Sequence, residues 1–132
     1  MKNVAITENH LYQKAYKNGK RFVGKTVAVY LLKDLAAGRL RRANPEKKFV
    51  NRLGLSVSKK IGGAVTRNRA KRVIRAAYEP LGNELKTGFL IVISARGGIV
   101  GQKSTDVSNE LRAAFTQFGL LKEATEQNNS TK

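Results

Sequence analysis

The sequence predicts an α/β fold in which helices pack on one sheet around a single core. The chain has 132 residues, which is enough for one such core and too few for two. Apolar residues make up 41% of the chain, and they fall in runs with the periodicity of strands and helices. We therefore expect one domain over residues 1–120, followed by a polar, disordered tail at residues 121–132.

The first half of the chain is predicted to contain a helix and two strands. The helix covers residues 8–19, with Thr7 as its N-cap and Gly19 at its C-terminal end. Residues 26–32 are rich in β-branched and aromatic side chains, which predicts a strand. Residues 53–57 alternate between large apolar residues and Gly or Ser, so this second predicted strand has one apolar face and one face nearly bare of bulk.

The second half is predicted to contain two longer helices that flank a buried strand. The first helix covers residues 63–79 and ends before Pro80. Residues 88–95 form a continuous apolar run, which is typical of a strand buried on both faces. The last helix begins at Ser104 or Thr105, either of which can cap it, and continues with an apolar stripe at helical spacing.

The charge of the chain points to a polyanionic partner. Lys and Arg number 26 and Asp and Glu number 9, so the net charge is +17, and self-repulsion of this size opposes the compact state. Nucleic acid and an anionic membrane would both offset it. The sequence offers no lipidation signal, no signal peptide and no apolar span of about 20 residues. Without Cys it has no disulfide or thiolate metal site, so we expect a cytoplasmic nucleic-acid-binding protein without membrane contact.

One face of the helix at 63–79 is strongly basic. At about 100° per residue, the arc opposite the apolar stripe holds Asn68, Lys71, Arg72 and Arg75, with Arg67 and Arg69 at its edges. A solvated helix face usually places Glu four residues before Lys or Arg, and this face lacks such pairs. Glu79 interrupts the face only at its end. The cations also crowd toward the helix N-terminus, where the macrodipole disfavours them. We interpret the face, enlarged by Lys59 and Lys60, as a phosphate-binding surface, with a solvated face as the alternative.

Residues 54–75, GLSVSKKIGGAVTRNRAKRVIR, resemble the signature of the bacterial ribonuclease P protein component family, and the resemblance extends over about residues 5–120. It implies an α+β sandwich like the second domain of ribosomal protein S5, with its elements in the order αβββαβα. It also implies a left-handed βαβ crossover, which the usual right-handed preference would not suggest. The basic stretch at 34–50 is predicted to be a long, mobile connection of open role, longer than is common in the family.

The resemblance also implies partners and site residues. The chain would be the protein subunit of the ribonucleoprotein that removes the 5′ leader from precursor tRNA by endonucleolytic cleavage. Contact with the catalytic RNA subunit would fall on Lys59, Lys60, Arg67, Asn68, Arg69, Lys71, Arg72 and Arg75. The single-stranded leader would lie in a cleft between the first helix and the sheet, on Tyr12, Tyr16 and Tyr30. Family members often carry Phe at the first two positions, and both residue types can stack on bases.

The chain itself shows no catalytic constellation. It has one His, no Cys and nine scattered acids, without the paired carboxylates or placed base that a protein nuclease needs. His10 is expected to be a surface residue. We therefore expect no catalytic residue, metal site or cofactor in this chain, and magnesium bound by the RNA subunit. A ribosomal or ribosome-assembly protein and an autonomous nuclease remain alternatives, and a monomer is expected in isolation.

Overall fold

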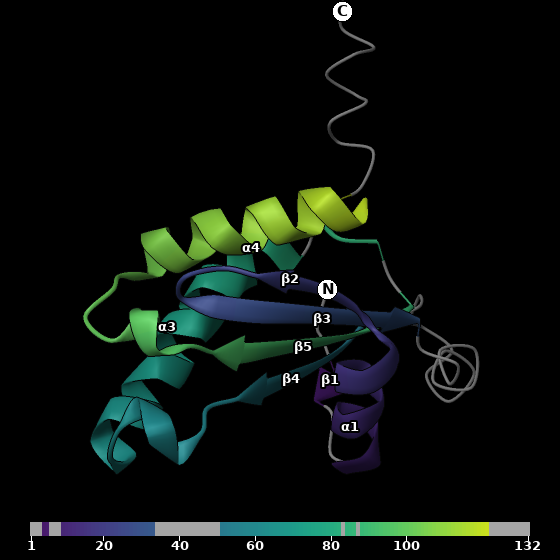
Figure 1. The fold of residues 1–132 in the computed structure, drawn as a ribbon. Coiled ribbons are helices and arrows are strands. Elements are labelled where there is room, and N and C mark those ends of the chain that lie inside the picture. Colours follow the sequence, from purple (N-terminus) through teal and green to yellow (C-terminus); the bar gives the residue numbers. More distant parts are fainter. Residues whose placement is uncertain (1–3, 6–8, 34–50, 83, 87, 122–132) are drawn as a thin grey trace, which may run out of the picture.

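The computed structural model describes residues 4–5, 9–33, 51–82, 84–86 and 88–121 (Figure 1). Its elements are β1 (Val4–Ala5), α1 (Asn9–Asn18), β2 (Lys20–Val23), β3 (Val27–Lys33), β4 (Arg52–Ser56), the 3₁₀ turn η1 (Lys59–Ile61), α3 (Ala64–Gly82), β5 (Phe89–Ala95), the 3₁₀ turn η2 (Gly97–Ile99) and α4 (Ser104–Phe118). The order αβββαβα is confirmed, with the two-residue β1 added in front. The predicted cap Thr7, the connection at 34–50 and residues 122–132 of the predicted tail lie outside the described residues.

The sheet contains five strands in the order β1-β4-β5-β3-β2. β4 is parallel to β1 and β5, whereas β3 is antiparallel to β5 and β2. The central strand β5 is buried from Leu90 to Ile93, which confirms the prediction of a strand covered on both faces. β1 is too short to leave a sequence pattern, and β2 is an exposed edge strand rich in cations, so neither was located from the sequence.

The helices lie in two layers on opposite faces of the sheet. α1 packs on one face against Leu90 and Val92, whereas α3 and α4 pack together on the other face. In Figure 1 the parallel strands β4 and β5 point to the left, β5 lies above β4, and α3 passes behind them. This path makes the β4–α3–β5 crossover left-handed, as the resemblance implies. It leaves the outward face of α3 uncovered by the rest of the described chain.

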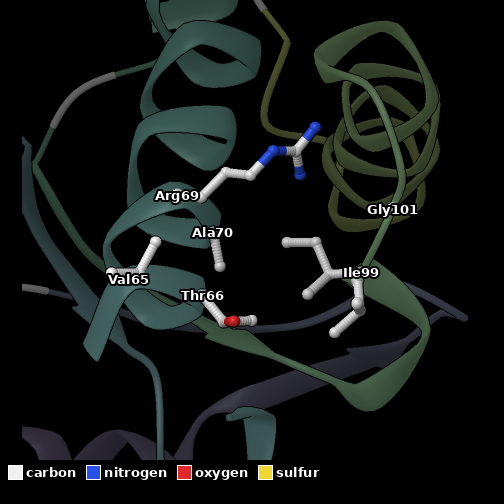
Figure 2. A pocket seen from close by; sticks show the side chains of 7 residues that line it. Val65, Thr66, Arg69, Ala70, Ile99 and Gly101 are labelled. Carbon is white, nitrogen blue, oxygen red and sulfur yellow. The ribbon is translucent and has the colours of Figure 1, made fainter. Parts of the chain in front are cut away.

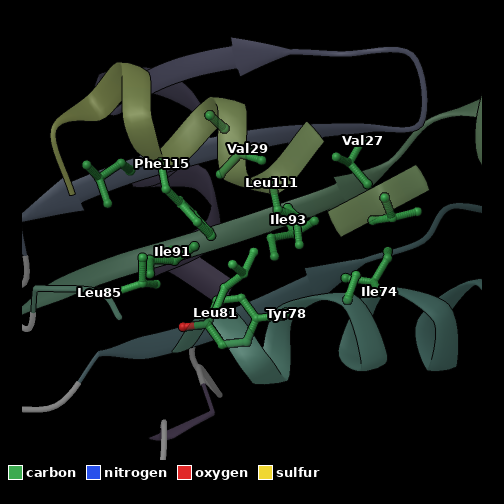
Figure 3. Packing of buried hydrophobic residues seen from close by; sticks show 14 of the residues in the cluster. Val27, Val29, Ile74, Tyr78, Leu81, Leu85, Ile91, Ile93, Leu111 and Phe115 are labelled. Atoms are coloured by element: carbon green, nitrogen blue, oxygen red, sulfur yellow. The ribbon is translucent and has the colours of Figure 1, made fainter. Parts of the chain in front are cut away.

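The main core fills the space between the sheet and the pair α3 and α4 (Figure 3). Val29 and Ile93 of the sheet meet Ile74 of α3 and Phe115 of α4, all of them fully buried. The Tyr78 ring packs edge-on against Phe115, with centroids 6.1 Å apart. Burial of one such aliphatic or aromatic side chain contributes about 1.5–3 kcal/mol to folding. The apolar arc predicted for α3 is therefore confirmed, and its basic arc faces outward.

The predicted end of α3 before Pro80 is wrong, because the helix continues through Pro80 to Gly82. Proline cannot donate a hydrogen bond to the carbonyl of Ala76, one turn earlier. Both residues are exposed, so water can hydrate that carbonyl. Leu81 is only 1% exposed, and its burial holds the last turn on the core.

The predicted caps of α4, Ser104 or Thr105, are also wrong. Lys103 is the N-cap, and Ser104 is the first helical residue. The backbone N–H of Lys103 donates to Asp106 Oδ2 at 3.1 Å, so the acid three residues into the helix satisfies the cap. The other end agrees with the sequence, since Gly119 has the left-handed conformation (φ 71°) that glycine favours.

A carboxylate of α4 holds the turn between β2 and β3. Glu110 Oε1 accepts hydrogen bonds from the backbone N–H groups of Thr26 at 3.0 Å and Val27 at 3.3 Å. Arg96, at the end of β5, donates to the Gly24 carbonyl at 2.6 Å. The Glu110 contacts hold the hairpin on α4, and the Arg96 contact holds it at the end of β5. Within the described ranges no helix is long and apolar enough to cross a membrane.

Candidate nucleic-acid interface

The eight residues predicted to bind RNA lie on one continuous stretch, η1 followed by the outward face of α3. We call this set the basic surface: Lys59, Lys60, Arg67, Asn68, Arg69, Lys71, Arg72 and Arg75. Six of them are exposed, and Arg67 and Lys71 are half-buried. The first turn of α3 contains no acidic residue. No acidic residue lies between Lys59 and Arg75, and Glu79 follows Arg75 by one turn. The surface therefore keeps a strong positive charge, which favours phosphate binding.

Arg67 differs from its neighbours because its side chain also supports the backbone. Its Nε donates to the Gly62 carbonyl at 3.1 Å, and its own N–H donates to the Gly63 carbonyl at 2.9 Å. Gly62 has a φ of 150°, which only glycine adopts without strain. Arg67 therefore ties α3 to the turn that carries Lys59 and Lys60. The sequence placed Arg67 at the edge of the basic arc, and it contained no signal for this contact.

The three tyrosines predicted to bind the leader meet on the opposite face of the sheet. Tyr12 and Tyr16 project from α1, one turn apart, and Tyr30 projects from β3. The Tyr16 and Tyr30 rings meet edge to face with centroids 4.9 Å apart, and the Tyr12 and Tyr16 centroids are 6.5 Å apart. All three rings are half-buried against Leu90 and Val92. The structure thus brings them together as the tyrosine cluster.

Gly54 allows the tyrosine cluster to lie close to the sheet. A methyl group at this position would stand 2.6 Å from Tyr12 Oη and 2.7 Å from two carbons of its ring. The sequence showed a strand face bare of bulk at 53–57, but it did not show that Tyr12 fills the space over Gly54.

Small side chains continue this face of the sheet beyond Gly54. Ser56 of β4 pairs with Ser94 of β5, and Ser94 pairs with Ala28 of β3. Paired residues of neighbouring strands point to the same face, so the three form a row of small side chains in the sheet. Ser58 lies past the end of β4, directly before η1, so it does not belong to this row. The row leaves hydroxyl groups next to the tyrosine cluster.

Burial against β4 raises the pKa of Tyr12 above its ordinary value, and the neighbouring Tyr16 raises it further. A hydrogen bond with the Leu55 backbone acts in the opposite direction and lowers the pKa. The Tyr12 hydroxyl is therefore neutral at physiological pH, and it can donate or accept a hydrogen bond.

The two surfaces meet at the C-terminal end of β4. Gly54 and Ser56 face α1 and the tyrosine cluster, and the chain then enters η1 with Lys59 and Lys60. His10 is exposed at the start of α1. Among the residues that the structure describes, no three His, Cys, Asp or Glu side chains are grouped closely enough to hold a metal ion.

Solved structures of RNase P proteins share this architecture. The RNase P protein of Staphylococcus aureus superimposes with a TM-score of 0.69 at 27% identity, covering 92% of this chain and all of that one. A mutant of the Staphylococcus aureus protein, described as defective in mRNA degradation activity, gives a TM-score of 0.72 at 26% identity. The RNase P protein of Thermotoga maritima gives a TM-score of 0.66 at 21% identity, and this comparison supports a shared fold only.

Sequence comparison assigns the family. The model of the Ribonuclease P family matches residues 1–119. The ribonuclease P protein component of Clostridium acetobutylicum is 32% identical over 121 residues, which is 92% of this chain and 93% of that protein. The Thermoanaerobacter sp. component is 35% identical over 119 residues, or 90% and 92% of the two chains. The chain therefore belongs to the family of bacterial ribonuclease P protein components.

Proposed function

We propose that this chain binds the catalytic RNA of ribonuclease P through the basic surface and binds the 5′ leader of precursor tRNA through the tyrosine cluster. Family membership supports the part of the proposal that makes this chain a subunit of a ribonucleoprotein. The observation that carries leader binding is the cluster itself, in which Tyr12, Tyr16 and Tyr30 meet beside a row of small residues. Bases of any identity can stack on such rings, at about 1–3 kcal/mol each.

In this proposal the protein contributes positioning and counter-charge. Arg72 and Arg75 of α3 each bind a phosphate of the folded RNA with two parallel hydrogen bonds. Ser56 and Ser94 offer hydroxyls to the leader backbone next to the tyrosine rings. The RNA subunit holds the magnesium ions and performs the hydrolysis, so the leader is cleaved only in the ribonucleoprotein, in the cytoplasm.

The tyrosine cluster also separates this function from the ribosomal alternative. A ribosomal or ribosome-assembly protein needs the basic surface, but it has no use for three clustered rings beside small residues. Co-purification with ribosomal subunits would favour that alternative. An autonomous nuclease would instead cleave precursor tRNA without any RNA subunit, in a metal-dependent reaction.

Reconstitution tests the proposal directly. The purified protein is added to the cognate catalytic RNA at near-physiological magnesium, and 5′ processing of a precursor tRNA is measured. We expect processing by the ribonucleoprotein and none by the protein alone. Tyr16→Ala should weaken binding of precursor tRNA and leave binding of mature tRNA nearly unchanged, because only the precursor carries a leader. Equal weakening of both, or cleavage by RNA-free protein, would contradict the proposal.

A further inference from the structure

A cavity of about 390 Å³ opens between the first two turns of α3 and the segment that follows β5 (Figure 2). Its lining residues are Val65, Thr66, Arg69 and Ala70 on the α3 side and Ile99, Val100 and Gly101 on the opposite side. The volume is within the range of small-ligand sites, roughly 300–1,000 Å³. Arg69 is the one lining residue that belongs to the basic surface, and no residue of the tyrosine cluster lines the cavity.

The cavity has an apolar floor and an apolar rim. Ala70 and Ile99 are buried, at 4% and 1% exposure, and they belong to the main core. Val65 and Val100 line the same cavity at 81% and 53% exposure, and they are two of the three exposed large hydrophobic residues in the described part of the chain. Valine is a weak helix former, so Val65 at the start of a basic helix gains nothing from propensity or from packing. Both side chains remain available to an outside group.

Cations surround this apolar opening. In Figure 2 the Arg69 guanidinium extends across the cavity toward the Gly101 segment, where Nη2 donates to the Gln102 carbonyl at 3.4 Å. This bond is long, so the guanidinium can exchange it for a ligand at little cost. Arg69 also lines an adjoining hollow of about 370 Å³, together with Arg72 and Lys103.

Acidic side chains are absent from the residues that line either hollow. The nearby Asp106 carboxylate accepts from the Lys103 N–H at 3.1 Å, so it already has a partner. An apolar cavity that shares one arginine with a cationic hollow can receive both parts of a nucleotide. The base would enter the cavity, and its phosphate would lie in the hollow.

We propose that the cavity binds the base of an unpaired nucleotide of the RNA subunit, with Arg69 stacked on the base and Arg72 and Lys103 on the adjacent phosphate. This inference rests on the proposed function. The charge of the surroundings selects RNA over an apolar protein side chain, because Arg69 and Arg72 belong to the basic surface. The base must be unpaired, because the edges and faces of a paired base are not free to enter a cavity.

The test removes the apolar rim without changing any charge. In the double variant Val65→Ser, Val100→Ser, affinity for the catalytic RNA should fall about 5- to 150-fold, as for loss of one stacked base. The salt dependence of binding should keep its slope, because no phosphate contact is lost. Chemical probing of the RNA bases should show one unpaired nucleotide that is protected by the wild-type protein and exposed with the variant. Val23→Ser is the matched control, since Val23 is 52% exposed on β2 and does not line the cavity.

A second variant distinguishes a base-binding cavity from a surface that attracts RNA by charge alone, because the two predict opposite changes in RNA affinity. Val65→Lys, Val100→Lys adds two cations, so a surface that attracts RNA by charge alone should bind more tightly. Binding weaker than wild type, despite the added charge, would support a base in the cavity. Unchanged affinity and unchanged base protection in the serine variant would overturn the inference, as would protection that appears only on precursor tRNA. Failure of the wild-type protein to bind the RNA would instead refute the proposed function.

Discussion

Gly54→Ala should alter the tyrosine cluster without changing any tyrosine. The new methyl group would stand 2.6–2.7 Å from three atoms of the Tyr12 side chain. Carbon atoms in contact prefer about 3.5–4.0 Å, so the ring must move away from β4 by about 1 Å. Gly54 has a φ outside the left-handed region, so alanine fits its backbone without strain.

The expected effects on folding and on binding differ in size. Displacement of Tyr12 breaks its hydrogen bond with the Leu55 backbone, at a cost of about 0.5–1.5 kcal/mol. Replacement of glycine by alanine restricts the unfolded chain and returns about 0.4–1 kcal/mol. The free energy of unfolding should therefore change by less than about 1 kcal/mol. Loss of one stacked base would weaken leader binding by about 1–3 kcal/mol.

The assay compares precursor and mature tRNA binding by the reconstituted ribonucleoprotein. For Gly54→Ala, the affinity for precursor tRNA should fall about 5- to 150-fold, whereas the affinity for mature tRNA should be unchanged. Gly97→Ala is the matched control, because a methyl group there meets no atom within 4 Å. An unchanged precursor affinity for Gly54→Ala would refute the role of Tyr12. A loss of unfolding free energy above about 3 kcal/mol would instead show that the ring is a structural element.

Three further changes probe the rest of the molecule. Arg75→Gln should reduce the slope of log affinity for the RNA subunit against log salt by about one, whereas Arg112→Gln, on the exposed ion pair with Glu84, should leave it unchanged; equal slopes would mark Arg75 as a solvated residue. Glu110→Ala leaves two backbone N–H groups without their acceptor, so urea unfolding should show a loss of about 1–3 kcal/mol with RNA affinity intact. Burial raises the pKa of Tyr12 above that of the unfolded chain, so the neutral hydroxyl stabilises the fold below a pH of about 10. This stabilisation is lost as the pH rises further and the hydroxyl ionises. In Tyr12→Phe the free energy of unfolding should therefore fall less at alkaline pH than in the wild type. Identical alkaline unfolding curves for the two proteins would contradict a raised pKa of Tyr12.

Local patterns in the sequence were sufficient to predict most of the elements and the basic surface. Helical periodicity separated the buried arc of α3 from its basic arc, because side chains three or four residues apart share a face in any helix. The apolar run at Leu90–Ile93 predicted a central strand, because a strand covered on both faces carries apolar side chains at successive positions. The sequence therefore determined which residues of α3 face outward, and the resemblance of its signature to the family predicted an RNA partner for them.

Contacts between distant segments were decided only by the tertiary structure. Tyr12 meets Gly54 because α1 packs over β5, which lies beside β4 in the sheet. Glu110 meets Thr26 because α4 packs against β3. The cavity between Val65 and Val100 likewise exists only after the crossover places η2 next to α3. Periodicity reports on neighbours within one element, whereas these contacts join residues that lie 35 to 84 positions apart. Their geometry depends on how the layers pack, which no local pattern encodes.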